Sequence, residues 1–396
     1  MSVIPTFDYN QRLSELQAAQ QQAVKTKNPG QWHSTNWYCK HQNPVVTPAH
    51  VPLTWRYNLH RDQNPLLLEN LPIQATFNAG ALERDGRIAM MVRVEGHDRK
   101  SFFGLAWSQN GIEGFEFTDH AIVIPETEDP DVNVYDMRLV EHADGWVYGL
   151  FCTERKDPDA PHGDLSSAVA QCGIVRSKDL VSWERLPDLK SHSAQQRNVV
   201  LHPEFVEGKY AFYTRPQDGF IDAGSGGGIG WALCDDITCP VVGEEKIIES
   251  RAYHTIKEVK NGQGPAPIRS SIGWIHLAHG VRGTATGLRY VLYVFVTDLE
   301  DPTKIIYSPG GAFIVPEGDE QVGDLSHIVF SNGWVSKDDG TVLIYYASCD
   351  TRMHVATTTL DRLIAYCRQV PEDPLRSFSC VAQRNSLIDN NLNESN

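Results

Sequence analysis

Five times along the chain, a tight-turn signal containing glycine leads into a short run of aromatic and β-branched residues. The turn glycines are Gly86, Gly145, Gly208, Gly273 and Gly340, and the steps between them are 59, 63, 65 and 67 residues. A long and nearly constant period indicates a repeat architecture, and strands bounded by turn residues are typical of propeller blades. The pattern therefore predicts an all-β fold, a five-bladed β-propeller.

A second strand-like run follows the first within each period. These runs cover residues 102–107, 170–176, 228–233, 290–296 and 353–358. Repetition as a pair of strands is expected for the middle and outer part of a blade. Since the loops of all blades meet at the mouth of a central channel, residues that are distant in sequence can converge there. We therefore expect the chemistry at that mouth.

The repeats place the propeller, which we expect to be the catalytic domain, at residues 40–358. Residues 1–39 include apolar positions at helical spacing within 8–27, which predicts an N-terminal helical arm. This arm packs either on another subunit or on its own ring. Residues 359–396 begin with a similar pattern, which predicts a C-terminal helix and a tail. The overall expectation is a propeller with short N-terminal and C-terminal helical extensions.

Composition limits the classes of function. The formal net charge of −15 disfavours a nucleic-acid partner, so any anion site has to be a local basic cluster. No apolar run approaches the roughly 18 residues of a membrane span, and the start of the chain lacks the pattern of a signal peptide. The eight cysteines are scattered, as expected for reduced thiols. We expect a cytoplasmic enzyme without a membrane partner.

Charged and amide residues stand at strand ends whose neighbours are apolar, and successive blades contribute one or two each. They are Asn78, Arg93, Asp136, Arg197, Arg215, Lys260, His279 and Asp350. Taken singly, each has a structural explanation: Asp136 could pair with Arg138, and His279 could be a core histidine with satisfied nitrogens. Taken together, two arginines, a lysine and a histidine near one carboxylic acid predict an oxyanion pocket, because these groups match phosphate oxygens in charge and donor geometry.

At this point the chain resembles a known family, glycoside hydrolase family 130, over about residues 43–359. These are five-bladed propellers that are mostly β-mannoside phosphorylases. The motifs that carry the resemblance are Phe77-Asn-Ala-Gly-Ala81, Arg93-Val-Glu-Gly96, Tyr135-Asp-Met-Arg138, Gln196-Arg-Asn-Val-Val-Leu-His-Pro-Glu204, Thr214-Arg-Pro216, Leu277-Ala-His-Gly280 and Tyr345-Tyr-Ala-Ser-Cys-Asp350. The blocks Asp98-Arg-Lys-Ser-Phe-Phe103, Gly163-Asp-Leu-Ser-Ser167 and 214–222 resemble the subgroup that acts on 4-O-β-D-mannosyl-D-glucose.

The resemblance implies an inverting glycoside phosphorylase, a hexosyltransferase that forms α-D-mannose 1-phosphate and D-glucose reversibly. It implies that Asp136 is the general acid, relaying its proton through the mannosyl 3-hydroxyl. It also implies two groups of binding residues. Arg197, Arg215, Lys260 and His279 would hold phosphate, while Asn78, Arg93, Tyr135 and Asp350 would hold the mannosyl unit and Arg99 the acceptor.

Elementary chemistry agrees with a single acid. An inverting hydrolase needs a second carboxylate to activate water, whereas phosphate is already a nucleophile and only has to be positioned and desolvated. The cationic pocket favours the ionised form of Asp136, although the acid has to be protonated to act. We hypothesise that bound phosphate offsets these cations, so that the acid is set up mainly in the ternary complex. Inorganic phosphate is then a co-substrate, and no cofactor is expected.

Two other signals carry less weight. The glycine-rich run 224–230 lacks the Gly-x-Gly-x-x-Gly register and precedes a strand, so it is either a flexible loop near the channel or a plain blade connection. The histidines and cysteines show no paired metal-ligand spacing, so no metal is expected.

Three alternatives stay open. The first is a β-mannoside hydrolase, which would have no use for four cationic groups. The second is a carbohydrate-binding propeller without activity, which would gain nothing from Asp136. The third is a phosphorylase with N-acetylglucosamine or mannose as acceptor, a choice that depends on loops 153–172 and 217–228. A homo-oligomer is also expected, because similar enzymes assemble through terminal helices.

Overall fold

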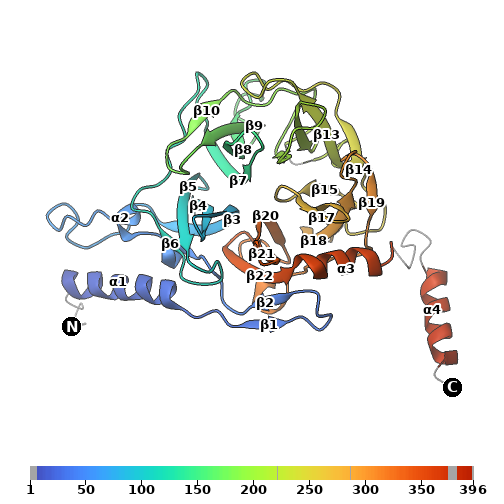
Figure 1. The fold of residues 1–396 in the computed structure, drawn as a ribbon. Helices are drawn as coiled ribbons and strands as arrows, with labels where there is room; N and C mark the ends of the chain where they lie inside the picture. The colour runs from blue at the N-terminus through green and yellow to red at the C-terminus, as the bar shows by residue number, and fades with distance from the viewer. Residues whose placement is uncertain (1–6, 221, 286, 373–380, 395–396) are drawn as a thin grey trace.

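The computed structural model describes residues 7–220, 222–285, 287–372 and 381–394. Five antiparallel sheets are arranged radially around a common centre (Figure 1). Each predicted pair of strands lies in one of these sheets, so the five-bladed propeller is confirmed. None of the described helices has the length and apolar composition needed to cross a bilayer.

The first two blades are four-stranded and follow chain order from the centre outward. Blade 1 consists of β3 (Ile73–Arg84), β4 (Arg87–Gly96), β5 (Ser101–Ser108) and β6 (Glu116–Phe117). Blade 2 consists of β7 (Asn133–Glu141), β8 (Val147–Lys156), β9 (Ala168–Ser177) and β10 (Glu184–Leu186). The turns Asp85-Gly86 and Asp144-Gly145 join the two inner strands of each blade, as predicted.

Blades 3 and 4 continue the same order. Blade 3 consists of β11 (Val200–Leu201), β12 (Tyr210–Thr214), β13 (Ile229–Cys234) and β14 (Lys246–Glu249). Blade 4 consists of β15 (Lys260–Gln263), β16 (Ile268–Ser270), β17 (Gly273–Thr284), β18 (Gly287–Thr297) and β19 (Ile305–Tyr307), where β15 and β16 both pair with β17.

Blade 5 closes the ring with strands from both ends of the chain. It consists of β20 (Val329–Ser336), β21 (Thr341–Ser348), β22 (Arg352–Thr359), β2 (Cys39–His41) and β1 (Gly30–Trp32). Cys39 and Lys40 pair with Thr357 and Ala356. The segment expected to be only a helical arm therefore also supplies the outer edge of this blade, and the sheet begins at residue 30.

The helices lie outside the ring (Figure 1). α1 (Tyr9–Lys25) starts at Asp8, whose carboxylate accepts hydrogen bonds from the first free N–H groups of the helix. Tyr9 packs with Leu53, Tyr57 and Leu67, residues of α2 (Leu53–Arg56) and the loop that follows it. The described contacts thus place α1 on its own chain, near the short helix η1 (Pro48–His50), and leave most of its surface exposed.

Two helices follow the last blade, and the sequence pattern predicts the first of them. α3 (Leu360–Gln369) is capped by Thr359 and buries Leu363, Tyr366 and Cys367 against blades 4 and 5. α4 (Val381–Glu394) has no buried residue. The short helix η2 (Gly318–Gln321) lies in the connection between blades 4 and 5.

The core is divided into five layers, each between two neighbouring sheets. Phe77 and Met90 of blade 1, for example, lie in one cluster with Leu343 and Tyr345 of blade 5. Equivalent clusters join every other pair of adjacent blades. Because strand side chains alternate between the faces of a sheet, each blade contributes apolar residues on both faces and is held from both sides.

Three of the innermost strands interrupt their pairing at the same place in the repeat. The register shifts in β3 between Phe77 and Gly80, in β7 between Tyr135 and Arg138, and in β20 between Phe330 and Gly333. At Gly80, a Cβ atom would lie only 2.7 Å from the backbone oxygen of Met137, so neighbouring blades approach too closely there for a side chain. Bulges of this kind redirect side chains, and they do so here at the centre of the ring.

Candidate active site

Asp136 lies in the bulge of β7, in a left-handed conformation with φ of 61°. Asn78, in the equivalent bulge of β3, has φ of 47°. Such backbone costs about 1–3 kcal/mol per residue and is maintained only where the surroundings impose it. Asn78 Nδ2 donates to Asp136 Oδ1 at 2.9 Å. The two bulges therefore bring an amide and a carboxyl group from adjacent blades into contact.

Arg93 of β4 is the second partner of Asp136. Its Nη1 donates to Asp136 Oδ1 at 2.9 Å, and its Nη2 pairs with Glu95 Oε2. Its guanidinium stacks on Tyr135 at 4.7 Å. Burial opposes the charge of Arg93, but Asp136, Glu95 and Asp350 together outweigh burial and raise its pKa. Arg93 is therefore a fixed cation among carboxyl groups.

Both donors to Asp136 reach the same oxygen. In the described part of the chain, Oδ1 accepts from Asn78 and Arg93, while no hydrogen bond is made by Oδ2. The side chain is 16% exposed, so it is open to a small molecule. A carboxyl group held in this way can carry its proton on Oδ2 without losing either contact.

Asp350 and Tyr135 complete the acidic side. Asp350 follows Cys349 in the tight turn between β21 and β22, with φ of 53° and 49° respectively. Burial raises the pKa of Asp350 to about 7, and Asp136 and Glu95 add to this effect against the opposing influence of Arg93. Tyr135 is buried, and its hydroxyl accepts a hydrogen bond of 3.2 Å from Arg197 Nη2. Tyr135 therefore connects the acidic side to the basic side.

The basic side is built by blades 3 and 4. Arg197 precedes β11, Arg215 directly follows β12, Lys260 begins β15 and His279 lies within β17. Arg215 Nη1 donates to His279 Nε2 at 2.9 Å. Because arginine is only a donor, Nε2 of the neutral imidazole accepts, and its proton is on Nδ1.

These cationic groups are buried or half-buried, and no ion pair among the described residues balances them. Arg215 and Lys260 are 6% and 5% exposed, and no carboxylate of the described residues forms an ion pair with Arg197, Arg215 or Lys260. Arg197 Nε and His279 Nδ1 are buried and lack a hydrogen-bond partner in the same part of the chain. Buried donors without acceptors are costly, so their presence together indicates a site for an anion.

The pKa values show that these groups share one location. Burial, followed by the charges of Arg215 and Arg197, lowers the pKa of Lys260 to about 7. Burial also lowers the pKa of Arg215 to about 10. The pKa of His279 falls well below its usual value through burial and then through Arg215, Arg138 and Lys260. A bound anion would favour the protonated form of each of these groups.

The structure thus places nine of the ten predicted residues in two connected groups. Asn78, Arg93, Tyr135, Asp136 and Asp350 form the acidic side, and Arg197, Arg215, Lys260 and His279 form the basic side. Arg99 stands apart from both. It lies exposed in the turn between β4 and β5, and its backbone oxygen accepts a hydrogen bond from Asn133.

Two local explanations from the sequence are revised. Arg138 pairs with the backbone oxygen of Asp136 at 3.0 Å and not with its carboxylate. His279 is buried, but its Nδ1 is unsatisfied among the described residues, so it is not a fully satisfied core histidine. Sequence analysis also missed Glu95. Its spacing of two from Arg93 on one strand puts both side chains on the same face, which is the signal that could have found it.

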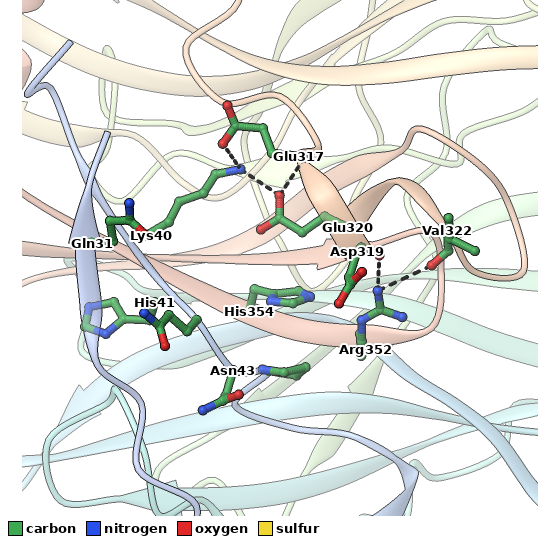
Figure 2. A pocket seen from close by; sticks show the side chains of 12 residues that line it. Gln31, Lys40, His41, Asn43, Glu317, Asp319, Glu320, Val322, Arg352 and His354 are labelled. Carbon is green, nitrogen blue, oxygen red and sulfur yellow. Dashed lines mark hydrogen bonds and ion pairs between the residues drawn. The ribbon is translucent and has the colours of Figure 1, made fainter. Parts of the chain in front are cut away.

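Two surface clefts are lined by other residues than this constellation. The larger, about 610 Å³, is bordered by β1, β2, β22 and η2 (Figure 2). Its charges are internally paired: Lys40 Nζ lies 2.6 Å from Glu320 Oε2 and 3.1 Å from Glu317 Oε2. Arg352 donates to the backbone oxygens of Asp319 and Val322.

The smaller cleft, about 530 Å³, is lined in part by the glycine-rich run. Gly227 accepts a hydrogen bond of 2.8 Å from the backbone of Asn261, the residue after Lys260. A Cβ atom at Gly226 would lie 1.9 Å from the backbone oxygen of Pro216, which explains the need for glycine there. The run lies in the connection between β12 and β13 of blade 3 and contacts the strand that begins with Lys260, so it is both a blade connection and a neighbour of the basic side.

Comparisons with known proteins agree with this geometry. Residues 41–369 match the model of the family described as beta-1,4-mannooligosaccharide phosphorylase. The chain is 58% identical over 384 residues to 4-O-beta-D-mannosyl-D-glucose phosphorylase of Bacteroides fragilis, which covers 97% of this chain and 98% of the relative. It is 26% identical to beta-1,4-mannooligosaccharide phosphorylase of Ruminococcus albus, covering 79% and 90% of the two chains.

Solved structures show the same fold. The beta-1,2-mannobiose phosphorylase of Listeria innocua aligns with a TM-score of 0.66 at 19% identity, covering 82% of this chain and 97% of the other. A structure described with the glycoside hydrolases that target beta-1,2 mannosidic linkages in Candida mannan aligns with a TM-score of 0.65 at 17% identity, covering 85% and 95%. Together with the match over residues 41–369, these findings show that the chain belongs to glycoside hydrolase family 130.

Proposed function

We propose that this protein is an inverting phosphorylase that converts 4-O-β-D-mannosyl-D-glucose and phosphate reversibly into α-D-mannose 1-phosphate and D-glucose. The 58% identity to the Bacteroides fragilis enzyme over nearly the whole chain supports this choice of substrate. The observation that carries the reaction type is a group of three cations, the buried Arg215 and Lys260 and the half-buried Arg197, none of which forms an ion pair with a carboxylate of the described residues. Tyr135 connects these cations to one carboxyl group, that of Asp136. Its hydroxyl accepts a hydrogen bond from Arg197, and its ring stacks on Arg93, the partner of Asp136.

In this proposal, Asp136 is the general acid. Its proton passes to the mannosyl 3-hydroxyl, whose own proton passes to the glycosidic oxygen as the bond from C1 to that oxygen breaks. A phosphate oxygen forms the new bond to C1 from the opposite face, so the configuration inverts. The arrangement at Oδ1 supports this role, because Asn78 and Arg93 occupy one oxygen and leave Oδ2 for the proton.

Arg197, Arg215, Lys260 and His279 hold phosphate in this scheme. Guanidinium and ammonium groups make strong, charge-assisted hydrogen bonds to phosphate oxygens. A neutral His279 with its proton on Nδ1 can still donate a hydrogen bond. Phosphate held there would also reduce the net positive potential of this group of cations.

The remaining residues bind sugar. Asn78, Arg93, Tyr135 and Asp350 surround the acid and hold the mannosyl unit. With a pKa of about 7, Asp350 can be protonated or ionised near neutral pH and can donate to or accept from a sugar hydroxyl. We assign Arg99 to the acceptor side. We also infer a cytoplasmic location and a homo-oligomeric assembly, as the sequence suggests, with no cofactor besides phosphate as co-substrate.

One alternative is hydrolysis, since a structural neighbour in the same family is described with glycoside hydrolases. A hydrolase gains nothing from three clustered cations, two of them buried, that form no ion pair with the described carboxylates, so the geometry favours phosphorolysis. A second alternative keeps phosphorolysis but uses N-acetylglucosamine or mannose as acceptor. The similarity to the mannosyl-glucose enzyme favours glucose.

Product analysis tests the proposal. Purified protein is incubated with 4-O-β-D-mannosyl-D-glucose, with and without inorganic phosphate, and sugars and sugar phosphates are quantified. We expect release of α-D-mannose 1-phosphate only with phosphate. Equal release of free mannose in both reactions would overturn the proposal. Turnover only of mannosides that carry another sugar in place of glucose would show that glucose is not the acceptor.

A further inference from the structure

The backbone of the proposed acid is held by a residue to which no role in the reaction has been given so far. Asp136 has φ of 61° and interrupts the pairing of β7 with β8, so the ladder does not support its peptide groups. The direction of its carboxyl group depends on that backbone. Something other than the sheet has to maintain it.

Arg138 makes the contacts that do so. Its Nη1 donates to the backbone oxygen of Asp136 at 3.0 Å. Its Nε donates to the backbone oxygen of Gly264 at 3.0 Å, and its Nη2 donates to Asn198 Oδ1 at 2.7 Å. Asn198 Nδ2 in turn donates to the backbone oxygen of Gln263 at 2.9 Å. One side chain of blade 2, only 3% exposed, thus connects the acid to blades 3 and 4, which carry the basic side.

We propose that Arg138 is a positioning residue for the reaction: it fixes the left-handed backbone of Asp136 and sets the acid at a defined distance from the phosphate-binding blades. This inference rests on the proposed function. The role proposed for Arg138 is anchoring and not phosphate binding, because three of its five N–H groups, one on each nitrogen, donate to protein oxygens. Its planar fork donates from three separate nitrogens, whereas a lysine would have to reach the same three oxygens from one nitrogen.

A second left-handed residue of the site, Asn78, is held in a parallel way. Asn332, in the bulge of β20, donates through Nδ2 to the backbone oxygen of Asn78 at 3.1 Å. Asn332 is 1% exposed. In both cases a buried side chain holds the carbonyl of a strained residue at the centre of the ring. The recurrence supports a positioning role.

The test compares two substrates that differ in their need for an acid. Cleavage of 4-O-β-D-mannosyl-D-glucose requires a proton on the leaving glucose, whereas the dinitrophenolate released from 2,4-dinitrophenyl β-D-mannoside leaves without one. Arg138→Met and Arg138→Lys are assayed on both substrates with saturating phosphate. Asp136→Asn gives the reference pattern for loss of the acid. Arg185→Met is the control, because Arg185 is a buried arginine of the same blade that pairs with Asp131 and Asp188.

We expect Arg138→Met to lower kcat on the disaccharide on the order of 100-fold, since a small displacement of an acid has effects of this size. The KM for phosphate should change by less than about threefold, because the phosphate ligands are untouched. On the aryl mannoside the loss should be below about threefold. Arg138→Lys should show the same selectivity with a smaller loss, and Arg185→Met should show no difference between the substrates.

An equal loss on both substrates in Arg138→Met or Arg138→Lys would overturn the proposal, because it would indicate a general structural defect. So would an increase in the KM for phosphate large enough to explain the loss. If neither variant folds, as judged by circular dichroism, the role is structural and the proposal fails. Wild-type protein that releases free mannose instead of mannose 1-phosphate would refute the proposed function but not the positioning role, because the ratio between the two substrates can still be measured.

Discussion

The two sides of the site differ in how their charges are satisfied. On the acidic side, Arg93 lies among Asp136, Glu95 and Asp350, so its charge is balanced within the protein. On the basic side, Arg215 and Lys260 are as deeply buried but form no ion pair with a carboxylate of the described residues. The acidic side is complete by itself, whereas the basic side becomes balanced only when an anion is present. A difference of this kind within one site indicates that the basic side binds an anion.

The largest effect is expected at the acid. Asp136→Asn keeps the size of the side chain but removes the transferable proton, so kcat on the disaccharide should fall on the order of 1,000-fold. The assay is release of mannose 1-phosphate, with phosphate binding measured by calorimetry as the control. A fall of less than tenfold would mean that the acidic side does not supply the proton. The two sides of the site would then not have the separate roles given to them.

The next effect is expected on the basic side. Lys260→Met preserves most of the side-chain volume but removes the charge, so the KM for phosphate should rise about 10- to 100-fold, the range for a lost charge-assisted hydrogen bond. The kcat at saturating phosphate should change much less. Lys209→Met, which removes an exposed lysine paired with Asp235, is the matched control. An unchanged KM for phosphate would contradict the assignment of phosphate binding to the basic side.

The pH dependence of phosphate affinity sharpens the comparison. Lys260 has a pKa of about 7 in the free protein, so above that pH it has to take up a proton before it can act as a cation. Relative to Lys260→Met, wild-type affinity for phosphate should therefore fall about tenfold from pH 7.5 to 8.5. Comparing the two proteins removes the ionisation of phosphate itself. If the affinity of the two proteins for phosphate changed with pH in the same way, Lys260 would not take up a proton on phosphate binding.

The smallest effect is expected outside both sides. Arg99 is exposed in the turn between β4 and β5, and exposed charges contribute little. In the synthetic direction, Arg99→Ala should raise the KM for glucose about threefold and leave the KM for mannose 1-phosphate unchanged. Initial rates at varied glucose measure this change. A change in both constants would place Arg99 within one of the two sides after all.

Much of the fold was accessible from the sequence because the repeat is periodic. Each turn glycine and each strand pair depends on local patterns, and all five were found where expected. Ring closure was not predictable in the same way. β1 and β2 have three residues each, too few to show a period, and Cys39 pairs with Thr357 at the other end of the chain.

The same division applies to the site. Asp136 and the basic residues stand out in sequence because charged groups occur in apolar strands. Their partners do not. Arg138 appeared to be a simple ion-pair partner two residues away, yet it donates to backbone oxygens and to Asn198 across two blades. Contacts to backbone atoms leave no trace in residue types, so only the structure reveals them.

The most direct test of the phosphate site is a ³¹P NMR time course of the wild-type protein with 4-O-β-D-mannosyl-D-glucose and inorganic phosphate. The account predicts that the phosphate signal declines while a signal of α-D-mannose 1-phosphate grows in equal amount to the glucose released. A constant phosphate signal, with free mannose appearing in equal amount to glucose, would show that water is the nucleophile and would contradict the role given to the unpaired cations.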